Sequence, residues 1–285
     1  MKRGRIATAK GQTRRHFLQA AGVSAASLAV AGRCLGQGPA ARKERLKLGL
    51  ASYTLRKFTL EQTLDMTRRV GLPYICLKSF HLPLDAEPDQ IAAAAAKVKD
   101  AGIELYGGGV ITMRDEAGVN LAFEYAKAAG MKTIVGVPMP PILPLVNRMV
   151  QKYDIEVAIH NHGPGDKTYP TPESAYEKIK NLDRRIGLCI DIGHTLRIGA
   201  DPIRDAERFA DRLLDVHLKD ISEASPKGRA VEVGRGVINI PRFLKTLIDI
   251  DYSRIASFEY EKDASDPLAG LAESVGYVRG VLATL

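Results

Sequence analysis

The chain has 285 residues, enough for one α/β barrel of about 250 residues, and its 45% hydrophobic and 26% charged content is ordinary for a soluble globular protein. Its net charge of +8 suggests a nucleic-acid partner until the charges are located. Seven basic residues and no acidic ones lie in residues 1–40, and without them 34 basic residues face 33 acidic ones. The excess charge therefore belongs to this leader, and composition gives no argument for a polyanion partner.

The leader has the order of segments found in an export signal. Basic residues precede Thr13-Arg14-Arg15-His16-Phe17-Leu18, and the small, apolar run Gln19–Gly32 follows. Paired arginines before Phe-Leu resemble a twin-arginine signal, which sends folded proteins across a bacterial membrane. The apolar run is too short and alanine-rich for a transmembrane span. We expect residues 1–40 to be an export signal and linker, disordered or removed, and the mature protein to be periplasmic or otherwise exported. Its membrane contact would then be limited to export. A basic tail is the alternative.

From Leu46 onward, strand-like and helix-like segments alternate. The strands predicted in the first half are Leu46–Tyr53, Tyr74–Ser79, Ile103–Tyr106 (running into three glycines) and Thr133–Val137. Helical spacing, with glycines after several of the segments, predicts helices at Leu60–Val70, Asp89–Ala101, Ala117–Ala129 and Leu143–Tyr153. The second half adds the strands Val157–His162, Gly187–His194, Leu213–Asp220 and Ile255–Glu261. Its predicted helices, with prolines at or near their starts, are Pro172–Asn181, Pro202–Arg212, Pro241–Ile250 and Pro267–Leu282.

Eight strand–helix units with short connections predict a single (β/α)8 TIM barrel over residues 46–285. Eight parallel strands close into a barrel without exposed edges. A doubly wound open sheet is the alternative, but no Gly-x-Gly-x-x-Gly follows the first strand. Cys76 and Cys189 both fall in predicted strands, where they are expected to be buried apolar residues and not a disulfide framework.

Metal-binding side chains end the four strands of the second half. In each strand an apolar stretch gives way to His, Asp or Glu at its carboxyl end. Such groups are costly in an apolar core unless they are paired or bind a metal. The carboxyl ends of parallel strands open on the same side of the sheet. The pattern therefore predicts that ligands from distant parts of the chain converge on one metal ion.

Individual residues also have simpler interpretations. Asp191 could cap the turn that follows it, and Glu259 and Glu261 could form salt bridges at the barrel rim. These two glutamates lie two residues apart on one strand and so share a face, as do His160 and His162. Of the two histidines, His160 is expected to lie deeper, nearer the metal, and His162 nearer the substrate.

A set of one Asp, one Glu and one or two His offers both oxygen and nitrogen ligands. Such a set suits Mn²⁺, Zn²⁺, Co²⁺ or Fe²⁺ better than an all-oxygen Ca²⁺ or Mg²⁺ cage. Open coordination positions would polarise a carbonyl or hydroxyl group, or acidify a bound water.

Five motifs from Leu46 to the C-terminus resemble the xylose-isomerase-like TIM barrel superfamily. They are Ile159-His160-Asn161-His162, Cys189-Ile190-Asp191-Ile192-Gly193-His194, Val216-His217-Leu218-Lys219-Asp220, Gly234-Arg235-Gly236-Val237-Ile238-Asn239 and Phe258-Glu259-Tyr260-Glu261. The resemblance implies a divalent metal held by His160, Asp191, His217 and Glu259. It also implies that His162 and His194 contact the substrate and that Lys219 or Arg235 orients its oxygen atoms. Lys78, at the end of the second strand, is a further candidate for the pocket.

Members of this superfamily include sugar isomerases and epimerases, dehydratases and endonuclease-IV-type enzymes. Family epimerases usually carry Glu where this chain has His160, and they exchange a proton between two metal-bound glutamates. This departure makes a symmetric two-glutamate reaction doubtful. A neutral histidine can still move a proton near neutral pH.

The predicted function is an exported, divalent-metal-dependent carbohydrate enzyme of the isomerase or epimerase kind that forms a metal-stabilised enediolate. Glu259 would hold the metal, and His160, His162 or Glu261 would move the proton. A lyase or hydratase acting on a keto-glycoside, with the same metal site, is one alternative, and a non-catalytic carbohydrate-binding barrel is another. A nuclease is disfavoured, because the barrel has few ligands in its first half and is nearly neutral.

Overall fold

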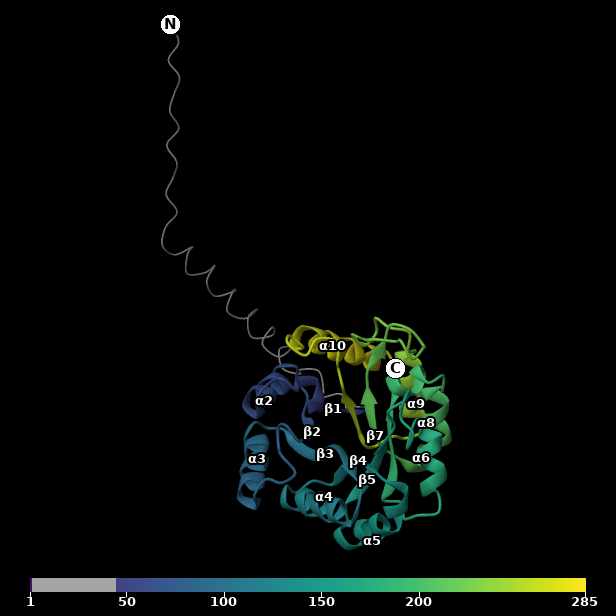
Figure 1. Cartoon of the computed structure of the whole chain (residues 1–285). Helices are drawn as coiled ribbons and strands as arrows, with labels where there is room; N and C mark the ends of the chain where they lie inside the picture. The colour runs from purple at the N-terminus through teal and green to yellow at the C-terminus, as the bar shows by residue number, and fades with distance from the viewer. Residues whose placement is uncertain (2–44) are drawn as a thin grey trace, which may run out of the picture. The chain divides into compact units, whose positions relative to one another are not determined.

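The computed structural model describes Met1 and residues 45–285, so the export signal expected in residues 1–40 lies outside the described residues apart from Met1. Residues 45–285 form a closed barrel of eight parallel strands in the order β1-β10-β7-β6-β5-β4-β3-β2 (Figure 1). The strands are β1 (Lys47–Ala51), β2 (Tyr74–Leu77), β3 (Glu104–Met113), β4 (Thr133–Pro138), β5 (Glu156–His160), β6 (Ile186–Asp191), β7 (Leu213–Leu218) and β10 (Ile255–Phe258). The predicted (β/α)8 fold is confirmed.

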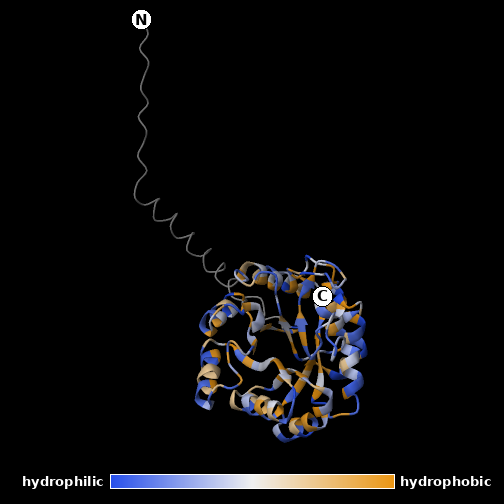
Figure 2. Ribbon diagram, viewed as in Figure 1, coloured by the Kyte–Doolittle hydropathy of each residue, from blue (hydrophilic) through white to orange (hydrophobic). Residues whose placement is uncertain are grey.

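Helices alternate with the strands and surround the barrel (Figure 1). They are α2 (Leu60–Arg69), α3 (Pro88–Asp100), α4 (Glu116–Ala128), α5 (Leu143–Tyr153), α6 (Pro172–Ile179), α7 (Ile192–Arg197), α8 (Pro202–Arg208), α9 (Ile240–Asp249) and α10 (Leu268–Thr284). Short 3-10 turns occur at η2 (Ser52–Leu55), η3 (Pro140–Ile142) and η4 (Ala210–Arg212). Figure 2 shows hydrophobic and hydrophilic residues alternating along these helices, as expected for helices with one face on the barrel. Within residues 45–285, none of the helices has the length and hydropathy needed to cross a membrane.

Side-chain caps set where several helices begin. The Thr59 side chain accepts a hydrogen bond from the backbone N–H of Gln62, whose own side chain accepts one from the N–H of Thr59. Thr171 and Ser174 form the same reciprocal arrangement before α6, where Pro172 occupies the first helical position. These local signals explain why the predicted helix starts agree closely with the structure.

The third strand is longer than the sequence predicts. The glycines Gly107–Gly109 do not end it at Tyr106, because β3 continues through them to Met113. A Cβ atom at Gly107 would lie 2.7 Å from the carbonyl oxygen of Thr133, and one at Gly108 would lie 2.9 Å from Met131 Sδ. The first two of these glycines thus allow β3 to pack closely against β4 and its surroundings.

The four ligand-bearing strands are shorter than predicted. They end at His160, Asp191, Leu218 and Phe258. After β6 the chain turns at once into α7, and after β7 it forms a small hairpin of β8 (Asp220–Ile221) and β9 (Ala230–Val231). The predicted first strand likewise ends early, with Ser52 and Tyr53 in η2. The predicted hydrophobic run therefore marks each strand, but local hydrogen bonding decides where it ends. Cys76 and Cys189 are free and buried, as predicted.

Candidate metal and substrate site

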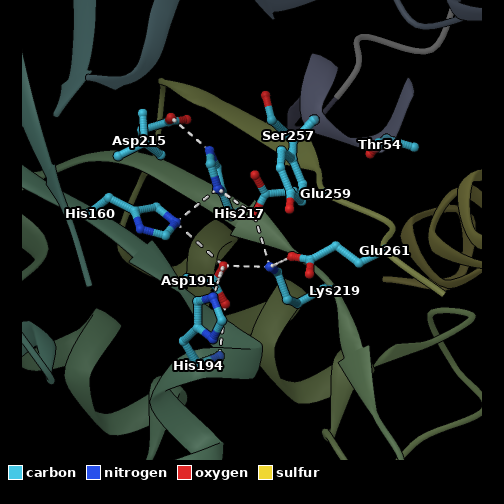
Figure 3. Close-up of polar contacts among 12 residues, drawn as sticks. Thr54, His160, Asp191, His194, Asp215, His217, Lys219, Ser257, Glu259 and Glu261 are labelled. Carbon is cyan, nitrogen blue, oxygen red and sulfur yellow. Dashed lines mark hydrogen bonds and ion pairs between the residues drawn. The ribbon is translucent and has the colours of Figure 1, made fainter. Parts of the chain in front are cut away.

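Four polar side chains meet at the carboxyl ends of neighbouring barrel strands (Figure 3). His160 ends β5, Asp191 ends β6, His217 lies in β7, and Glu259 directly follows β10. One nitrogen or oxygen atom from each residue lies within 4.8 Å of those of the other three. All four residues are buried, with Glu259 the most exposed at 5%. The residues predicted as metal ligands are thus brought together by the pairing of β5, β6, β7 and β10.

The atoms that face the centre of this cluster can be identified from their distances. His160 Nε2 lies 3.1 Å from His217 Nδ1 and 3.4 Å from Asp191 Oδ2. His217 Nδ1 in turn lies 3.1 Å from Glu259 Oε2. One nitrogen of each imidazole and one oxygen of each carboxylate therefore point toward a common centre.

Asp191 uses its two carboxylate oxygens differently. Oδ1 accepts a hydrogen bond of 2.8 Å from the backbone N–H of His194 and so caps α7. Oδ2 faces His160 and Lys219. The backbone N–H of Asp191 donates to Asn161 Oδ1 at 3.1 Å, which fixes the residue further. The turn-capping and metal-facing interpretations of this aspartate therefore both describe the structure.

Lys219 is placed differently from the expectation that it orients substrate. Its side chain is buried, and Nζ lies 2.8 Å from both Asp191 Oδ2 and Glu259 Oε2 and also contacts Glu261 (Figure 3). Burial alone lowers the pKa of a lysine, but Asp191 and Glu259 raise the pKa of Lys219 well above its ordinary value. The ammonium group is therefore committed to the acidic cluster.

The same contacts keep the carboxylates ionised. Burial raises the pKa of a carboxyl group, yet His194 and Lys219 together lower the pKa of Asp191, and Lys219 and His217 lower that of Glu259. With Glu261, three carboxylates surround one ammonium group. One positive charge against three negative charges leaves a formal charge of −2, which matches a divalent cation.

The two imidazoles of the cluster are in different electrostatic environments. Burial lowers the pKa of His160 to about 3, so this ring is neutral at neutral pH and keeps a lone pair for a metal. For His217, burial also lowers the pKa, but the adjacent Glu259 carboxylate outweighs it and raises the pKa. The other nitrogen of His217, Nε2, lies 3.7 Å from Asp215 Oδ2. This separation is too long for a hydrogen bond, and among the described residues His217 Nε2 has no hydrogen-bond partner, so Asp215 acts on the ring through its charge.

Asp215 was not identified from the sequence. Burial raises its pKa to about 6. Asp215 lies two residues before His217, so both side chains are on the same face of β7. This spacing is the feature of the sequence from which Asp215 could have been identified.

A cavity of about 310 Å³ opens beside the cluster. It is lined by Tyr53, Lys78, Val110, His160, His162, His194, Glu259 and Glu261. Six of these were predicted site residues, and the exceptions are Tyr53 and Val110. Neither was singled out from the sequence: Tyr53 was expected at the end of the first strand but lies in the turn η2, and Val110 lies in the unexpected extension of β3.

His162 and His194 face this cavity without belonging to the four-residue cluster. The His162 side chain is 41% exposed, and its Nδ1 lies 3.3 Å from Asp166 Oδ2. Burial and the neighbouring His194 lower the pKa of His162. Among the described residues, His194 Nδ1 has no hydrogen-bond partner. His162 is thus the more accessible of the pair His160 and His162, in agreement with their predicted depths.

Arg235 does not line the cavity, and the expectation that it contacts substrate is not supported by its position. Its guanidinium group pairs with Glu273 on α10, and its side chain is 65% exposed. The motif around it has a structural role instead. The backbone N–H groups of Gly234 and Gly236 each donate a 3.0 Å hydrogen bond to the buried carboxylate of Asp220. Lys78 does line the cavity, with Nζ 3.5 Å from the carbonyl oxygen of Val110.

The residues present fit a divalent metal. Two imidazole nitrogens and two ionised carboxylate oxygens converge at a buried point, and with the half-buried Glu261 the carboxylates outnumber the Lys219 ammonium group by two. The mixed nitrogen and oxygen donors suit Mn²⁺, Zn²⁺, Co²⁺ or Fe²⁺. His160, Asp191, His217 and Glu259 are the side chains that would hold such an ion.

Comparison with known proteins agrees with this geometry. A family model for the xylose isomerase-like TIM barrel matches residues 142–281, a range that includes all four residues of the cluster. A probable endonuclease 4 from Methanosphaera stadtmanae is 26% identical over 126 residues. That match covers 40% of this chain and 44% of the relative, so the chain spans less than half of that protein.

Solved structures of other proteins share the fold. The IOLI protein with a bound zinc atom superposes with a TM-score of 0.70 at 20% identity, covering 84% of this chain and 99% of that one. A 3-keto-D-glucoside 4-epimerase from E. coli superposes with a TM-score of 0.66 at 16% identity, covering 82% of this chain and 99% of that one. A probable 3-DHS dehydratase from Bacillus anthracis superposes with a TM-score of 0.65 at 14% identity, covering 82% of this chain and 99% of that one. At these identities the structures show a shared fold, and the family model adds that residues 142–281 are similar to the xylose isomerase-like TIM barrel.

Proposed function

We propose that this protein is a divalent-metal-dependent enzyme that moves a proton on a small carbohydrate, as a sugar isomerase or epimerase does. The observation that carries the proposal is the buried cluster of His160, Asp191, His217 and Glu259 beside a cavity lined by further acid–base groups. A bound metal would act as a Lewis acid that polarises a substrate carbonyl or hydroxyl group and stabilises negative charge on its oxygen.

His162 is the residue best placed to move the proton. The Asp166 carboxylate faces Nδ1 of His162, which favours the tautomer with a proton on Nδ1 and leaves Nε2 as a base. His160 belongs to the metal cluster, and Glu261 is held by Lys219. We therefore assign the proton transfer to His162 and the positioning of substrate hydroxyl groups to His194 and Lys78.

The reaction begins with removal of a proton from the carbon next to a carbonyl group. The electron pair of the broken C–H bond moves toward the carbonyl oxygen and gives an enediolate. Return of a proton to the same carbon from the opposite face, by an acid other than His162, completes an epimerisation, and return by His162 to the neighbouring carbon completes an isomerisation. An E. coli structure with this fold is a 3-keto-D-glucoside 4-epimerase, which supports a keto sugar as the substrate class.

A lyase or hydratase reaction is the second candidate. It starts with the same proton removal, but the electron pair then expels a substituent from the next carbon and forms a C=C bond. His160 favours this outcome, because family epimerases usually carry a second metal-bound glutamate at that position. A probable dehydratase shares the fold.

We also propose that the protein is exported through the twin-arginine route. The support is the order of basic, paired-arginine and apolar segments in residues 1–40. An exported enzyme would meet unphosphorylated sugars or glycosides, since phosphorylated intermediates are normally retained inside the cell.

Substitution of cluster and cavity residues separates metal binding from proton transfer. We expect Asp191→Asn to abolish stoichiometric metal binding and turnover together, because it removes a charged ligand. We expect His162→Gln to keep the metal but lower kcat about 10²–10⁴-fold, because it removes the proton-transfer group. Asp249→Asn, on an exposed ion pair of α9, is the matched control. Metal content is measured by mass spectrometry of the dialysed protein.

Turnover is followed by NMR in D₂O with 3-keto-glucosides as test substrates. An epimerase or isomerase incorporates deuterium at a carbon of the product, whereas a lyase gives an unsaturated product. Full metal content in Asp191→Asn would refute the assigned site. A wild-type protein that binds sugar but neither holds metal nor turns over would instead be a carbohydrate-binding barrel.

A further inference from the structure

A second cavity, of about 640 Å³, adjoins the metal and substrate site and shares Glu261 with it. Its walls come from the end of α7, the β8–β9 hairpin and the segment after β10. The charged residues that line it are Arg197, Arg229, Glu261 and Lys262. No residue of this cavity other than Glu261 takes part in the proposed reaction site.

Two of these charged residues have partners outside the cavity. Lys262 Nζ lies 2.8 Å and 3.0 Å from the two carboxylate oxygens of Glu232, so Lys262 contributes little net charge. Glu261 pairs with Lys219, which it shares with Asp191 and Glu259. A divalent ion in the four-residue cluster would offset the negative charge that remains at this boundary.

The two arginines have no such partner. Within residues 45–285, neither Arg197 nor Arg229 forms an ion pair with a carboxylate. Arg197 donates from Nη2 to the carbonyl oxygen of Pro226 at 3.0 Å, while its buried Nε has no hydrogen-bond partner among the described residues. A buried donor on a charged group without an acceptor is costly unless a ligand supplies one. Two guanidinium groups in one cavity make a site for an anion, since their planar donors match carboxylate and phosphate oxygens.

We propose that this cavity is a subsite for an anionic group of the substrate, located beyond the sugar unit that reacts: a carboxylate if the protein is exported, and a carboxylate or a phosphate if it is not. Glu261 forms the boundary, so a substrate with its reacting unit in the first cavity extends past Glu261 toward Arg197 and Arg229. The inference rests on the proposed function for the position of the reacting unit. It narrows the substrate class to acidic sugars or acidic glycosides.

Calorimetric titration of the full chain tests this subsite. The probes are cellobiose, cellobionate (which adds a carboxylate at the second unit) and α-D-glucose 1-phosphate, each titrated into Mn²⁺-treated and metal-free protein. We expect at least one acidic probe to bind roughly tenfold more tightly than cellobiose, as expected for a charged hydrogen bond. Arg197→Gln and Arg229→Gln should each remove that advantage. Arg204→Gln, an exposed arginine on α8, should keep it.

Preference for cellobionate identifies a carboxylate on the neighbouring unit, and preference for glucose 1-phosphate identifies a phosphate on the reacting unit. Equal binding of all three probes to the wild type overturns the proposal, as does an acid preference that survives both arginine substitutions. Metal content is measured separately. A wild type that holds no metal but still prefers an acidic probe contradicts the proposed reaction and not the subsite. Arg229 is exposed, so its substitution tests the subsite without disturbing the core.

Discussion

His81 is buried in a complete hydrogen-bond network outside the metal site. The backbone N–H of Lys78 donates to Ser52 Oγ, and the Ser52 hydroxyl lies 2.8 Å from His81 Nδ1. On the other side of the ring, Nε2 lies 3.0 Å from the Thr63 hydroxyl and 3.2 Å from the carbonyl oxygens of Leu55 and Phe58. Carbonyl oxygens only accept, so Nε2 carries the proton and Nδ1 accepts from Ser52. This network fits a neutral histidine, which the lowered pKa of the buried ring also favours.

We predict that His81 makes stability fall as the solution is acidified. Burial lowers its pKa below the ordinary value of 6.5, so the unfolded chain binds a proton at a higher pH than the folded protein does. Stability from the neutral ring is present above pH 6.5 and is lost as pH falls toward the folded pKa. At pH 7.5, His81→Gln should cost about 1–3 kcal/mol in the free energy of unfolding, and the gap should be smaller at pH 5. Urea unfolding of the wild type and the variant at both pH values measures this difference in the free energy of unfolding. A difference that is larger at pH 5 than at pH 7.5 would refute the assignment of a neutral His81.

The sequence was informative about residue types and less so about their individual roles. The strand-end pattern placed His160, Asp191, His217 and Glu259 near one another, because parallel strands bring their carboxyl ends together. It could not determine that Lys219 turns inward to the carboxylates while Arg235 turns outward to Glu273. Both are basic residues in loops after strands, and only tertiary contacts distinguish them.

Two glycines differ in how much space surrounds them, one in a strand and one in a helix. Gly187 lies in β6, where a Cβ atom would come within 2.2 Å of the carbonyl oxygen of Arg212 and 2.6 Å of Leu214 Cγ. Gly276 lies in the middle of α10, exposed, and a Cβ atom there would meet nothing within 4 Å. Gly187 is required because β6 approaches its neighbour closely, whereas Gly276 destabilises the helix in which it lies.

We therefore predict opposite effects of the same substitution at the two positions. Gly187→Ala should lower the free energy of unfolding by about 1–3 kcal/mol, because backbone and side chains must move apart. Gly276→Ala should raise it by about 0.5–1 kcal/mol, because alanine favours a helix over glycine. Thermal and urea unfolding measure both changes. If both substitutions changed the free energy of unfolding by the same amount, close packing of β6 against its neighbour would not be the reason for glycine at position 187.

Element boundaries followed local signals where those were strong. Capping side chains such as Thr59 and Thr171 marked helix starts. The helix α7 was missed because its capping residue, Asp191, lies at the end of a hydrophobic run that reads as continuous strand. The β8–β9 hairpin was also missed, since each strand has two residues and its pairing depends on the loop around Asp220. Neither feature has a periodic pattern for sequence analysis to detect.

At the scale of the whole molecule, eight repeated strand–helix units made the barrel predictable. The closing contact joins β1 to β10, more than 200 residues apart in sequence, and no local pattern specifies it. Closure follows instead from the number of units and from the cost of leaving sheet edges open. The pairing of β10 with β7 places Glu259 next to Lys219, so the acidic cluster depends on contacts between strands that lie about 40 residues apart in the sequence.

The distribution of charge over the whole chain leads to the last prediction. The barrel sequence is nearly neutral, and the excess positive charge lies in residues 1–40 around Arg14 and Arg15. If those arginines form a twin-arginine signal, their replacement by lysine should block export, because lysine keeps the charge but lacks the planar guanidinium group. We expect the full chain expressed in a bacterium with this pathway to reach the periplasm, and the Arg14→Lys, Arg15→Lys variant to stay in the cytoplasm.

Cell fractionation and immunoblotting measure the distribution. The matched control is Arg3→Lys with Arg5→Lys, which changes two leader arginines outside the motif and leaves the net charge equal in all three proteins. Because charge is constant, a difference between the two variants can arise only from the paired position. Export of both variants at the wild-type level would exclude the twin-arginine route, and retention of the wild type would exclude export itself. In the latter case sugar phosphates would return as candidate substrates, since the reason for excluding them depends on location and not on the barrel.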